Sequence, residues 1–294
     1  AEWSAWSARK FPRSRKSSRS RRVPKRIELH CHSTYSDGTL TPAELVGRAV
    51  ESGVELLVLT DHDSVSGGAD VFAAAAAAGL RVKLGIEINC SGEGAADRIH
   101  ILGYGLRPSA PGFAERLAEF RQRRSVRAQR IVEKLRALGI AIDFEHIRSC
   151  AHETLGRPHV ADALRRLGVV KSRKEAFDRF LMKGKPGYVD SMGPSPVEAI
   201  ALIRDAGGTA CLAHPQTAGK QNELDELVRA GLQGIEVLYS GHTPSQVRTY
   251  GDWAGAQGLL ACGGSDFHGP MTGRDERLGI EYDDLAYASV MERL

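Results

Sequence analysis

Histidine and carboxylate side chains occur in short clusters along this chain, and each cluster follows an apolar run with the composition of a β-strand. Imidazole nitrogens and carboxylate oxygens are ligands for divalent metal ions. Such groups gathered from several strand ends predict one site that holds more than one ion. The clusters are His30-Cys31-His32 with Asp37, Asp61-His62-Asp63, Glu87 with His100, Ala213-His214-Pro215, and Asp266-Phe267-His268.

Each cluster taken alone has a simpler explanation. Asp61 and Asp63 could cap the next helix, and His214 before Pro215 could be a hydrogen-bonded core histidine. Cys31 lies between two histidines, so on a strand its side chain should point to the opposite face. Independent accidents would not all fall at strand ends, and the joint pattern therefore favours a metal site.

The apolar runs alternate with helical patterns, which indicates an α/β fold with a parallel sheet or barrel. Functional residues of such folds collect at the carboxyl ends of the strands, where these clusters lie. Thr41, Pro42 and Glu44 form a capping-box pattern at the start of a helix over 41–52. Two further helices are predicted over 194–206 and 221–230. Seven strands are predicted, at 26–30, 55–60, 81–89, 98–104, 208–213, 234–239 and 259–264.

The alternation stops between the fourth and fifth predicted strands. We expect residues 108–190 to form an inserted helical subdomain, with helices over 111–138, 159–167 and 174–181. The barrel then consists of residues 27–107 and 191–294. The apolar residues of the first helix should pack inward, and much of its basic set should be a solvated face, although Arg124 and Arg127 could meet an anionic substrate. The apolar residues are Phe113, Leu117, Phe120, Ile131, Leu135 and Leu138.

Charge is unevenly distributed along the chain. Residues 1–26 contain ten Lys and Arg and one acid, so the remainder has 30 bases against 35 acids despite the formal net charge of +4. The Ser- and Arg-rich segment 1–26 is predicted to be a disordered basic tail that could help to hold RNA, or to have no role. It lacks the apolar region of a secretory signal.

The remaining composition excludes several classes of protein. The longest apolar stretch is too short to span a membrane. Five widely spaced cysteines without a CxxC pair predict reduced thiols and a cytoplasmic protein. Phosphate-binding GxxxxGK[ST] and nucleophile GxSxG motifs do not occur in the sequence. No obligate protein partner is indicated.

Six segments carry a family resemblance: LHCHSTYSDGTL, LTDHDSVSG, GIEIN, HILGYG, LAHP and GGSDFHG. Over about residues 27–270 the sequence resembles the PHP (polymerase and histidinol phosphatase) family. The resemblance implies a distorted seven-stranded (β/α)7 barrel with three divalent metal ions. Glu28 stands where an Asp is common in the family, and we expect a structural or supporting role for it.

The resemblance also implies how the ligands divide. One ion would be held by His30, His32, Glu87 and Asp266. A second would be held by Glu87, His100 and His214, and a third by Asp37, His62 and His268. The expected metal is Mn²⁺, with Zn²⁺ or Fe²⁺ as alternatives, because these ligand types do not select one ion.

Clustered divalent ions suit the hydrolysis of phosphate esters, since they bind phosphate oxygens, lower the pKa of a water and stabilise developing charge. We expect Asp61 and His159 to take part in catalysis. The acid that protonates the leaving oxygen stays open between His159, His242 and a water.

Two segments of the insertion resemble the PHP subgroup that acts on nucleotides and RNA 5′ ends: Gly156-Arg157-Pro158-His159 and the run from Lys183 to Tyr188. Arg157 can bind a phosphate through two parallel hydrogen bonds. Lys183 and Lys185 would add charge, although solvated surface lysines are an equal alternative, and Tyr188 could stack on a base. Arg157, His159, Lys183 and Lys185 are the predicted substrate-binding residues.

These features predict a metal-dependent phosphoesterase that removes the 3′-phosphate of nucleoside 3′,5′-bisphosphates. The same site could act as a 5′-to-3′ exoribonuclease on short 5′-phosphorylated RNA. The alternatives are a histidinol-phosphatase-like enzyme for small molecules and a non-catalytic module that binds metal or nucleic acid. Turnover of histidinol phosphate without turnover of nucleotides, or a lack of all turnover, distinguishes these alternatives.

Overall fold

The computed structural model describes residues 25–91, 99–217, 221–274 and 277–294. The predicted disordered tail thus lies outside the described residues, except for Lys25 and Arg26, which begin the first strand. One sheet of eight strands contains all the described strands, in the order β7-β6-β5-β4-β3-β2-β1-β8. They are β1 (Lys25–Cys31), β2 (Val54–Leu59), β3 (Arg81–Asn89), β4 (His100–Tyr104), β5 (Thr209–Leu212), β6 (Gly234–Tyr239), β7 (Leu260–Gly264) and β8 (Ile280–Tyr282).

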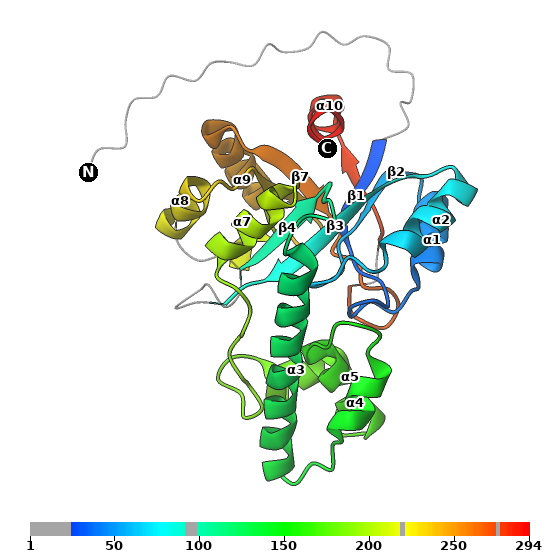
Figure 1. Cartoon of the computed structure of the whole chain (residues 1–294), viewed down its shortest axis with the longest axis vertical. Helices are drawn as coiled ribbons and strands as arrows, with labels where there is room; N and C mark the ends of the chain where they lie inside the picture. The colour runs from blue at the N-terminus through cyan, green and yellow to red at the C-terminus, as the bar shows by residue number, and fades with distance from the viewer. Residues whose placement is uncertain (1–24, 92–98, 218–220, 275–276) are drawn as a thin grey trace.

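The sheet curls until β7 approaches β1, so the fold is a nearly closed α/β barrel (Figure 1). Gly264 on β7 permits this approach: a Cβ atom there would lie 2.4 Å from Cβ of His30. A larger residue would therefore push apart the two strands that carry predicted metal ligands. Seven of the eight strands coincide with predicted runs.

The expectation of a parallel sheet was wrong at β4, which is antiparallel to both β3 and β5. This reversal explains why His100 lies at the first residue of its strand, whereas the other predicted ligands lie late in a strand or after its end. His100 pairs with Asn89, the last residue of β3, so the start of β4 meets the carboxyl end of β3. The reversal therefore keeps His100 at the same mouth of the barrel.

The eighth strand, which the sequence did not predict, is short and pairs antiparallel with β1. Glu28 of β1 is fully buried next to it and accepts hydrogen bonds from the backbone N–H groups of His30, Ser265 and Gly279. The hydroxyl of Ser265 donates a further bond of 2.5 Å. Burial raises the pKa of the Glu28 carboxyl. Glu28 thus ties β1 to the segment after β7 and has the structural role that the sequence indicated.

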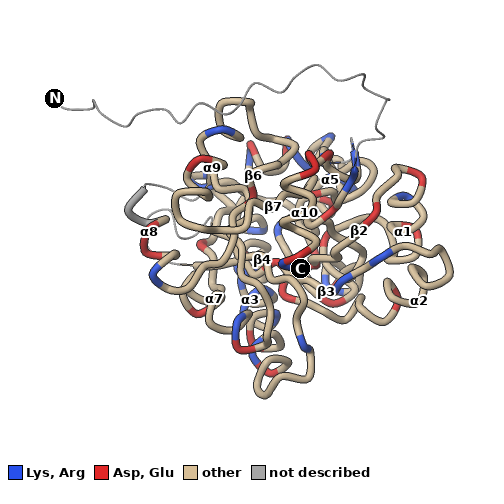
Figure 2. Tube along the Cα trace, turned by 90° about the horizontal axis from the view of Figure 1, so that it is seen from above, with Lys and Arg blue, Asp and Glu red and all other residues tan. Residues whose placement is uncertain are grey.

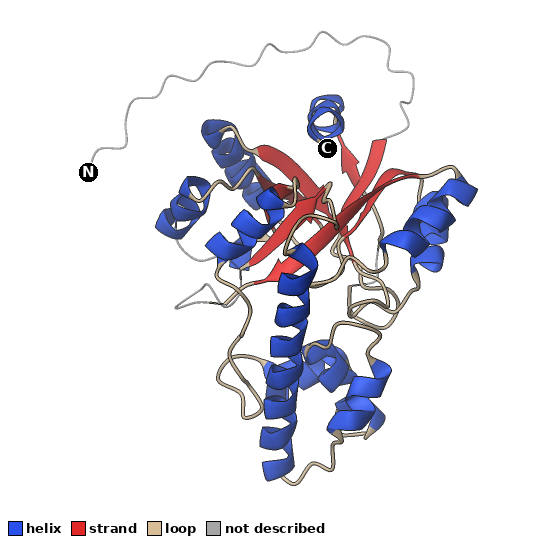
Figure 3. Ribbon diagram, in the orientation of Figure 1, coloured by secondary structure: helices blue, strands red, loops and turns tan. Residues whose placement is uncertain are grey.

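Helices cover the outside of the sheet, with α1 and α2 at one side and α7, α8 and α9 at the other (Figure 3). The predicted capping box at the start of α1 is confirmed, since Thr41 and Glu44 bond to each other's backbone. The helices of the barrel are α1 (Pro42–Glu51), α2 (Gly68–Ala78), α7 (Pro196–Asp205), α8 (Gln221–Arg229), α9 (Pro244–Gln257) and α10 (Asp284–Arg293). Among the described helices, none is long and apolar enough to cross a membrane.

The segment between β4 and β5 projects from the barrel and has an apolar core of its own (Figure 1). Its longest helix, α3, joins the two parts: Phe113 and Phe120 pack in the barrel core, whereas Ile131 and Leu135 pack in the second core. The prediction for Leu138 was wrong, because the helix ends at Ala137 and Leu138 is half exposed. The other elements here are α4 (Phe144–Cys150), α5 (Arg157–Arg166), α6 (Arg173–Ala176) and a π-helical turn over Phe177–Leu181.

Candidate metal centre

The predicted ligands of the first ion lie at the end of β1, in β3 and after β7. His30 Nε2 is 3.2 Å from Glu87 Oε2 and 3.4 Å from Asp266 Oδ1. His32 Nε2 is 3.1 Å and 3.4 Å from the same two atoms. Ligand atoms on a tetrahedral ion with bonds of about 2.1 Å lie about 3.4 Å apart. The four side chains therefore have the spacing of a coordination sphere.

All four of these facing atoms are buried and have no hydrogen-bond partner. Buried polar atoms without partners cost free energy, and native proteins rarely keep several of them together. A cation between His30 Nε2, His32 Nε2, Glu87 Oε2 and Asp266 Oδ1 would satisfy the whole set. The donor atoms thus fit the metal ion that the sequence implied.

Glu87 turns its other oxygen towards the second predicted group. Oε1 lies 2.7 Å from His100 Nδ1 and 3.1 Å from His214 Nε2. The His214 backbone has a φ of 27°, in the region that non-glycine residues rarely adopt. The backbone of His214 is therefore strained at the point where its side chain reaches Glu87, the carboxylate that the first and second groups share.

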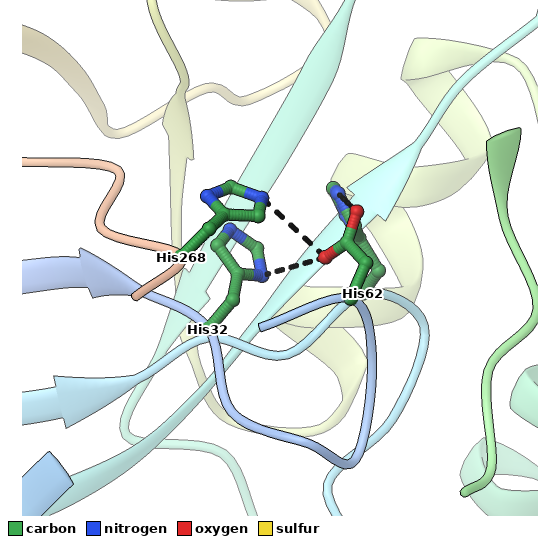
Figure 4. Close-up of side chains that lie close together, drawn as sticks. His32, His62 and His268 are labelled. Carbon is green, nitrogen blue, oxygen red and sulfur yellow. Dashed lines mark ion pairs between the residues drawn. The ribbon is translucent and has the colours of Figure 1, made fainter. Parts of the chain in front are cut away.

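The third group surrounds Asp37, which lies in the loop after β1. His268 Nε2 is 3.4 Å from Asp37 Oδ1, and His62 Nε2 is 3.7 Å from Oδ2. Figure 4 shows the imidazoles of His32, His62 and His268 converging from separate segments. His32 belongs to this group as well as to the first, with its Nδ1 3.9 Å from Asp37 Oδ1. The structure therefore brings all nine predicted ligands together in three overlapping groups.

Burial and mutual charge set the protonation of the cluster. Burial lowers the pKa of His62, His268 and His100, that of His100 to about 4. Burial acts in the same direction on His32, but the neighbouring Asp266 and Glu87 carboxylates outweigh it and raise the pKa to about 9. Metal binding needs the neutral imidazole, so loading an ion would release a proton from His32.

Asp61, a predicted catalytic residue, has a carboxylate that is already occupied. Its oxygens accept bonds of 2.7 Å and 2.6 Å from the backbone N–H and the hydroxyl of Ser33, and 2.6 Å from the hydroxyl of Ser36. It therefore holds the loop that carries Asp37, and its direct part in catalysis stays a prediction. The alternative that Asp61 or Asp63 caps the next helix was wrong, because Gly67 precedes α2.

Asp63 instead connects the barrel to the projecting helices. Its carboxylate pairs with Arg124 of α3 and accepts a bond of 3.3 Å from the backbone N–H of Asn89. The side chain of Arg121 donates to the Asp63 carbonyl at 3.0 Å. Asn89 in turn contacts the imidazole of His100. The position of α3 is thus linked to a predicted metal ligand through partly buried polar contacts.

A cavity of about 460 Å³, here called the phosphate pocket, opens between the metal centre and the projecting helices. Arg124, Arg127 and Arg157 line it, and basic residues recur along α3 (Figure 2). Burial lowers the pKa of Arg127 to about 9, and the positive charges of Arg157 and Arg124 add to the shift. Three guanidinium groups held this close repel one another unless an anion lies between them. Asp37, His62, His100 and His268 also line the pocket, as do Ile131, Leu155, Phe177 and Met182.

The predicted substrate residues take different positions. Arg157 lines the phosphate pocket, with its guanidinium 5.4 Å from the Phe177 ring centre and Nη1 3.4 Å from the carbonyl of Leu181. His159 accepts a bond from the Gly156 N–H and lines a separate, smaller hollow beside Asp37. Lys183 and Lys185 are exposed and do not line the phosphate pocket. Their part in substrate binding, like the alternative of surface charge, stays a prediction.

Sequence reasoning missed several residues of the centre. Glu236 is a single carboxylate inside the otherwise apolar run of β6, and that unusual position was the signal available in the sequence. The structure buries it fully beside two predicted ligands. Arg274 pairs with Asp266, and Tyr239 donates to Asp266 Oδ2 at 3.2 Å. No pattern marked Arg274, because it reaches the site from an irregular loop. His242, an open choice for the acid, bonds Gln216 and the carbonyl of Val237 instead.

Glu236 holds two predicted ligands at once. Oε1 lies 3.1 Å from His30 Nδ1, and Oε2 accepts a bond of 2.7 Å from the backbone N–H of His214. A carboxylate on the far nitrogen of a ligating histidine fixes the ring so that its other nitrogen faces the metal.

We expect Glu236→Ala to weaken metal binding by about 10- to 100-fold, as losses of such supporting partners do. Metal titration followed by calorimetry checks this. Glu226→Ala, on the outer helix α8, is the matched control. Equal metal affinity in Glu236→Ala and the control would contradict the supporting role.

Removal of divalent metal should destabilise the fold, because the cluster gathers like charges and partnerless atoms from six strand ends. Restoring Mn²⁺ at about 100 times its dissociation constant should raise the free energy of unfolding by about 2.7 kcal/mol. Thermal melts with chelator and with added Mn²⁺ measure the shift. Identical melts in both conditions would show that no ion binds the native state.

The chain is similar to several known proteins. The model of the PHP domain matches residues 28–179. The chain is 39% identical over 254 residues to a 3′,5′-nucleoside bisphosphate phosphatase of Chromobacterium violaceum, covering 84% of this chain and 88% of that protein. It is 35% identical to a 5′-3′ exoribonuclease of Haemophilus influenzae, covering 84% and 92%.

Among solved structures, a protein of Bifidobacterium adolescentis described as a metal-dependent phosphoesterase superposes with a TM-score of 0.82 at 31% identity. The match covers 92% of this chain and 98% of that one. With a family model spanning more than half of the sequence and relatives that align over most of their length, the chain belongs to the PHP domain family.

Proposed function

We propose that this protein is a metal-dependent phosphoesterase that hydrolyses the 3′-phosphate ester of nucleoside 3′,5′-bisphosphates to 5′-mononucleotides. One observation carries the proposal: five arginines, among them Arg124, Arg127 and Arg157, line the same cavity as four residues of the metal cluster. A substrate with two phosphates fits this arrangement, because one can meet the arginines while the other meets the ions. The relative from C. violaceum is named as a phosphatase of such bisphosphates, and the relative from H. influenzae is named as a 5′-3′ exoribonuclease.

The nine ligands would hold three divalent ions in the groups described above, and Mn²⁺ is the ion we expect. Bound ions would supply a water of lowered pKa and positive charge at the phosphate oxygens. The P–O3′ bond breaks, the water oxygen bonds to phosphorus, and the 3′ oxygen leaves with a proton. His159 would take up the proton of the attacking water and pass it to the leaving 3′ oxygen, because burial in the hollow beside Asp37 lowers its pKa and favours the neutral imidazole.

We treat residues 108–190 as a cap that selects the substrate, inserted into a barrel formed by residues 27–107 and 191–294. Arg157 and Arg127 would bind the 5′-phosphate, and the apolar wall of Ile131, Phe177 and Met182 would lie against the nucleoside. The charge of Arg124 is partly neutralised by Asp63, so Arg124 would help to orient the 5′-phosphate but contribute less to its binding.

The same bond chemistry extends to RNA. In a 5′-phosphorylated strand, cleavage of the P–O3′ bond after the first nucleotide releases a 5′-mononucleotide and leaves a new 5′-phosphate on the remainder. Each product strand is then a substrate again, so one site could serve both activities. Histidinol phosphate carries a single phosphate, so a histidinol phosphatase needs no second anion site. The arginine-lined pocket therefore favours a bisphosphate or RNA substrate over histidinol phosphate.

The test offers Mn²⁺-loaded protein adenosine 3′,5′-bisphosphate, 5′-AMP, histidinol phosphate and a short 5′-phosphorylated RNA in parallel. We expect AMP and phosphate from the bisphosphate, mononucleotides from the RNA, and no product from 5′-AMP. Hydrolysis of histidinol phosphate alone would replace the proposal with the amino-acid enzyme. No product in any reaction, with ions bound, would favour a non-catalytic module.

A further inference from the structure

A second hollow of about 790 Å³ adjoins the metal centre, and none of its described lining residues belongs to the helical cap. Its wall comes from the ends of β6 and β7, the loop after β7, and the paired strands β1 and β8. The residues that matter below are Arg26, Tyr239, Ser240, Arg274, Arg277 and Glu281. We call this hollow the side groove.

The side groove and the phosphate pocket meet at one wall. Gly273 and Arg274 line both. Arg274 pairs with Asp266, and the Tyr239 hydroxyl donates to the same carboxylate at 3.2 Å. Since Asp266 is a predicted metal ligand, the two hollows join beside the place where the reacting phosphate would lie.

The lining of the side groove suits a polyanion. Arg26, Arg274 and Arg277 face it against a single carboxylate among its described lining residues, that of Glu281. Glu281 is engaged by Arg26 at 3.1 Å. The ring of Tyr239 and the hydroxyl of Ser240 add a stacking surface and a hydrogen-bonding group. Cationic grooves with aromatic rings are the usual binding surface for single-stranded nucleic acid.

The bond chemistry of the proposed function requires such a place. When the P–O3′ bond breaks, the phosphorus stays with whatever is attached through its other ester oxygen. In a nucleoside bisphosphate nothing is attached there, and in RNA the rest of the strand is. With the first nucleotide held in the phosphate pocket, that strand must leave the metal centre in another direction.

We propose that the side groove holds the RNA strand on the 3′ side of the scissile phosphate. This inference rests on the proposed function and identifies polymeric RNA as a substrate of the same site. The groove runs from Arg274 to Arg26, next to the point where the basic sequence 1–24 is joined to the chain.

Arg277→Ala and the charge reversal Arg277→Glu test the inference, because Arg277 is exposed and does not line the phosphate pocket. Arg248→Ala, an exposed arginine on α9 outside both hollows, is the matched control. Full-length Mn²⁺-loaded proteins are assayed on adenosine 3′,5′-bisphosphate and on 5′-phosphorylated RNAs of two and five nucleotides. Thermal melts verify that all variants fold.

The quantity measured is the ratio of kcat/KM for the pentanucleotide to kcat/KM for the bisphosphate. We expect this ratio to fall about tenfold in Arg277→Ala, further in Arg277→Glu, and not in Arg248→Ala. The salt dependence of RNA turnover should weaken in the same order. The kcat/KM for the dinucleotide should fall less than that for the pentanucleotide, because the shorter strand contacts less of the groove.

An unchanged ratio in both Arg277 variants overturns the inference, as does wild-type protein that hydrolyses the bisphosphate but leaves RNA intact. Failure of the proposed function looks different, because wild-type protein would then release nothing from the bisphosphate either.

Discussion

Replacement of Glu87 with glutamine is expected to reduce kcat/KM for adenosine 3′,5′-bisphosphate by at least about 10³-fold, equivalent to about 4 kcal/mol of transition-state stabilisation. Glu87 faces two ligand groups at once, with Oε2 towards His30 and His32 and Oε1 towards His100 and His214. Glutamine has nearly the same shape but carries no charge and has only one oxygen. Steady-state kinetics at saturating Mn²⁺ measures the loss.

Metal content separates this expectation from a simple loss of stability. The Glu87→Gln protein should hold fewer ions than wild type by elemental analysis while it remains folded. Glu133→Gln, at an exposed position of α3, makes the same chemical change away from the centre and should keep full activity and metal content. Wild-type stoichiometry with wild-type kinetics in Glu87→Gln would show that the carboxylate does not bridge ions.

Arg157→Ala should lower kcat/KM for the 3′,5′-bisphosphate by about 10- to 100-fold and leave turnover of 3′-AMP nearly unaltered. A hydrogen bond to a charged group contributes about 1.5–3 kcal/mol, and only the bisphosphate carries the 5′-phosphate that Arg157 would bind. The measurement is a comparison of both substrates on the same protein preparations.

Arg157→Lys keeps the charge but loses the two parallel hydrogen bonds, so it should recover only part of the activity. Arg130→Ala, an exposed arginine of α3 outside the pocket, controls for general loss of positive charge. Equal losses on both substrates in Arg157→Ala would mean that Arg157 supports the pocket wall and does not read the 5′-phosphate.

Strand positions and ligand identities were accessible from the sequence because both depend on local patterns. Buried strands show as short apolar runs, and the polar residue that ends such a run must face the mouth of the barrel. His30 and His32 illustrate this: alternation along β1 places both on one face and Cys31 on the other, where its thiol packs in a core cluster. The capping box at Thr41 and Glu44 is equally local.

Helix ends and strand directions were harder to predict. The direction of β4 depends on which neighbouring strands it pairs with, and no residue within 100–104 specifies that pairing. Leu138 continues the apolar spacing of α3, yet the chain turns at Gly139 and leaves it half exposed.

What the sequence by itself determined is the set of groups that can bind metal, since their types and their places after apolar runs are properties of each segment. Only the tertiary structure decided how they are shared: Glu87 belongs to the first and second groups, His32 belongs to the first and third, and Glu236 supports both His30 and His214. It also placed Arg274 beside Asp266, Arg127 in the phosphate pocket, and Lys183 and Lys185 outside that pocket. The reason is physical, because contacts between segments far apart in the chain depend on how the barrel closes, and local patterns do not record that closure.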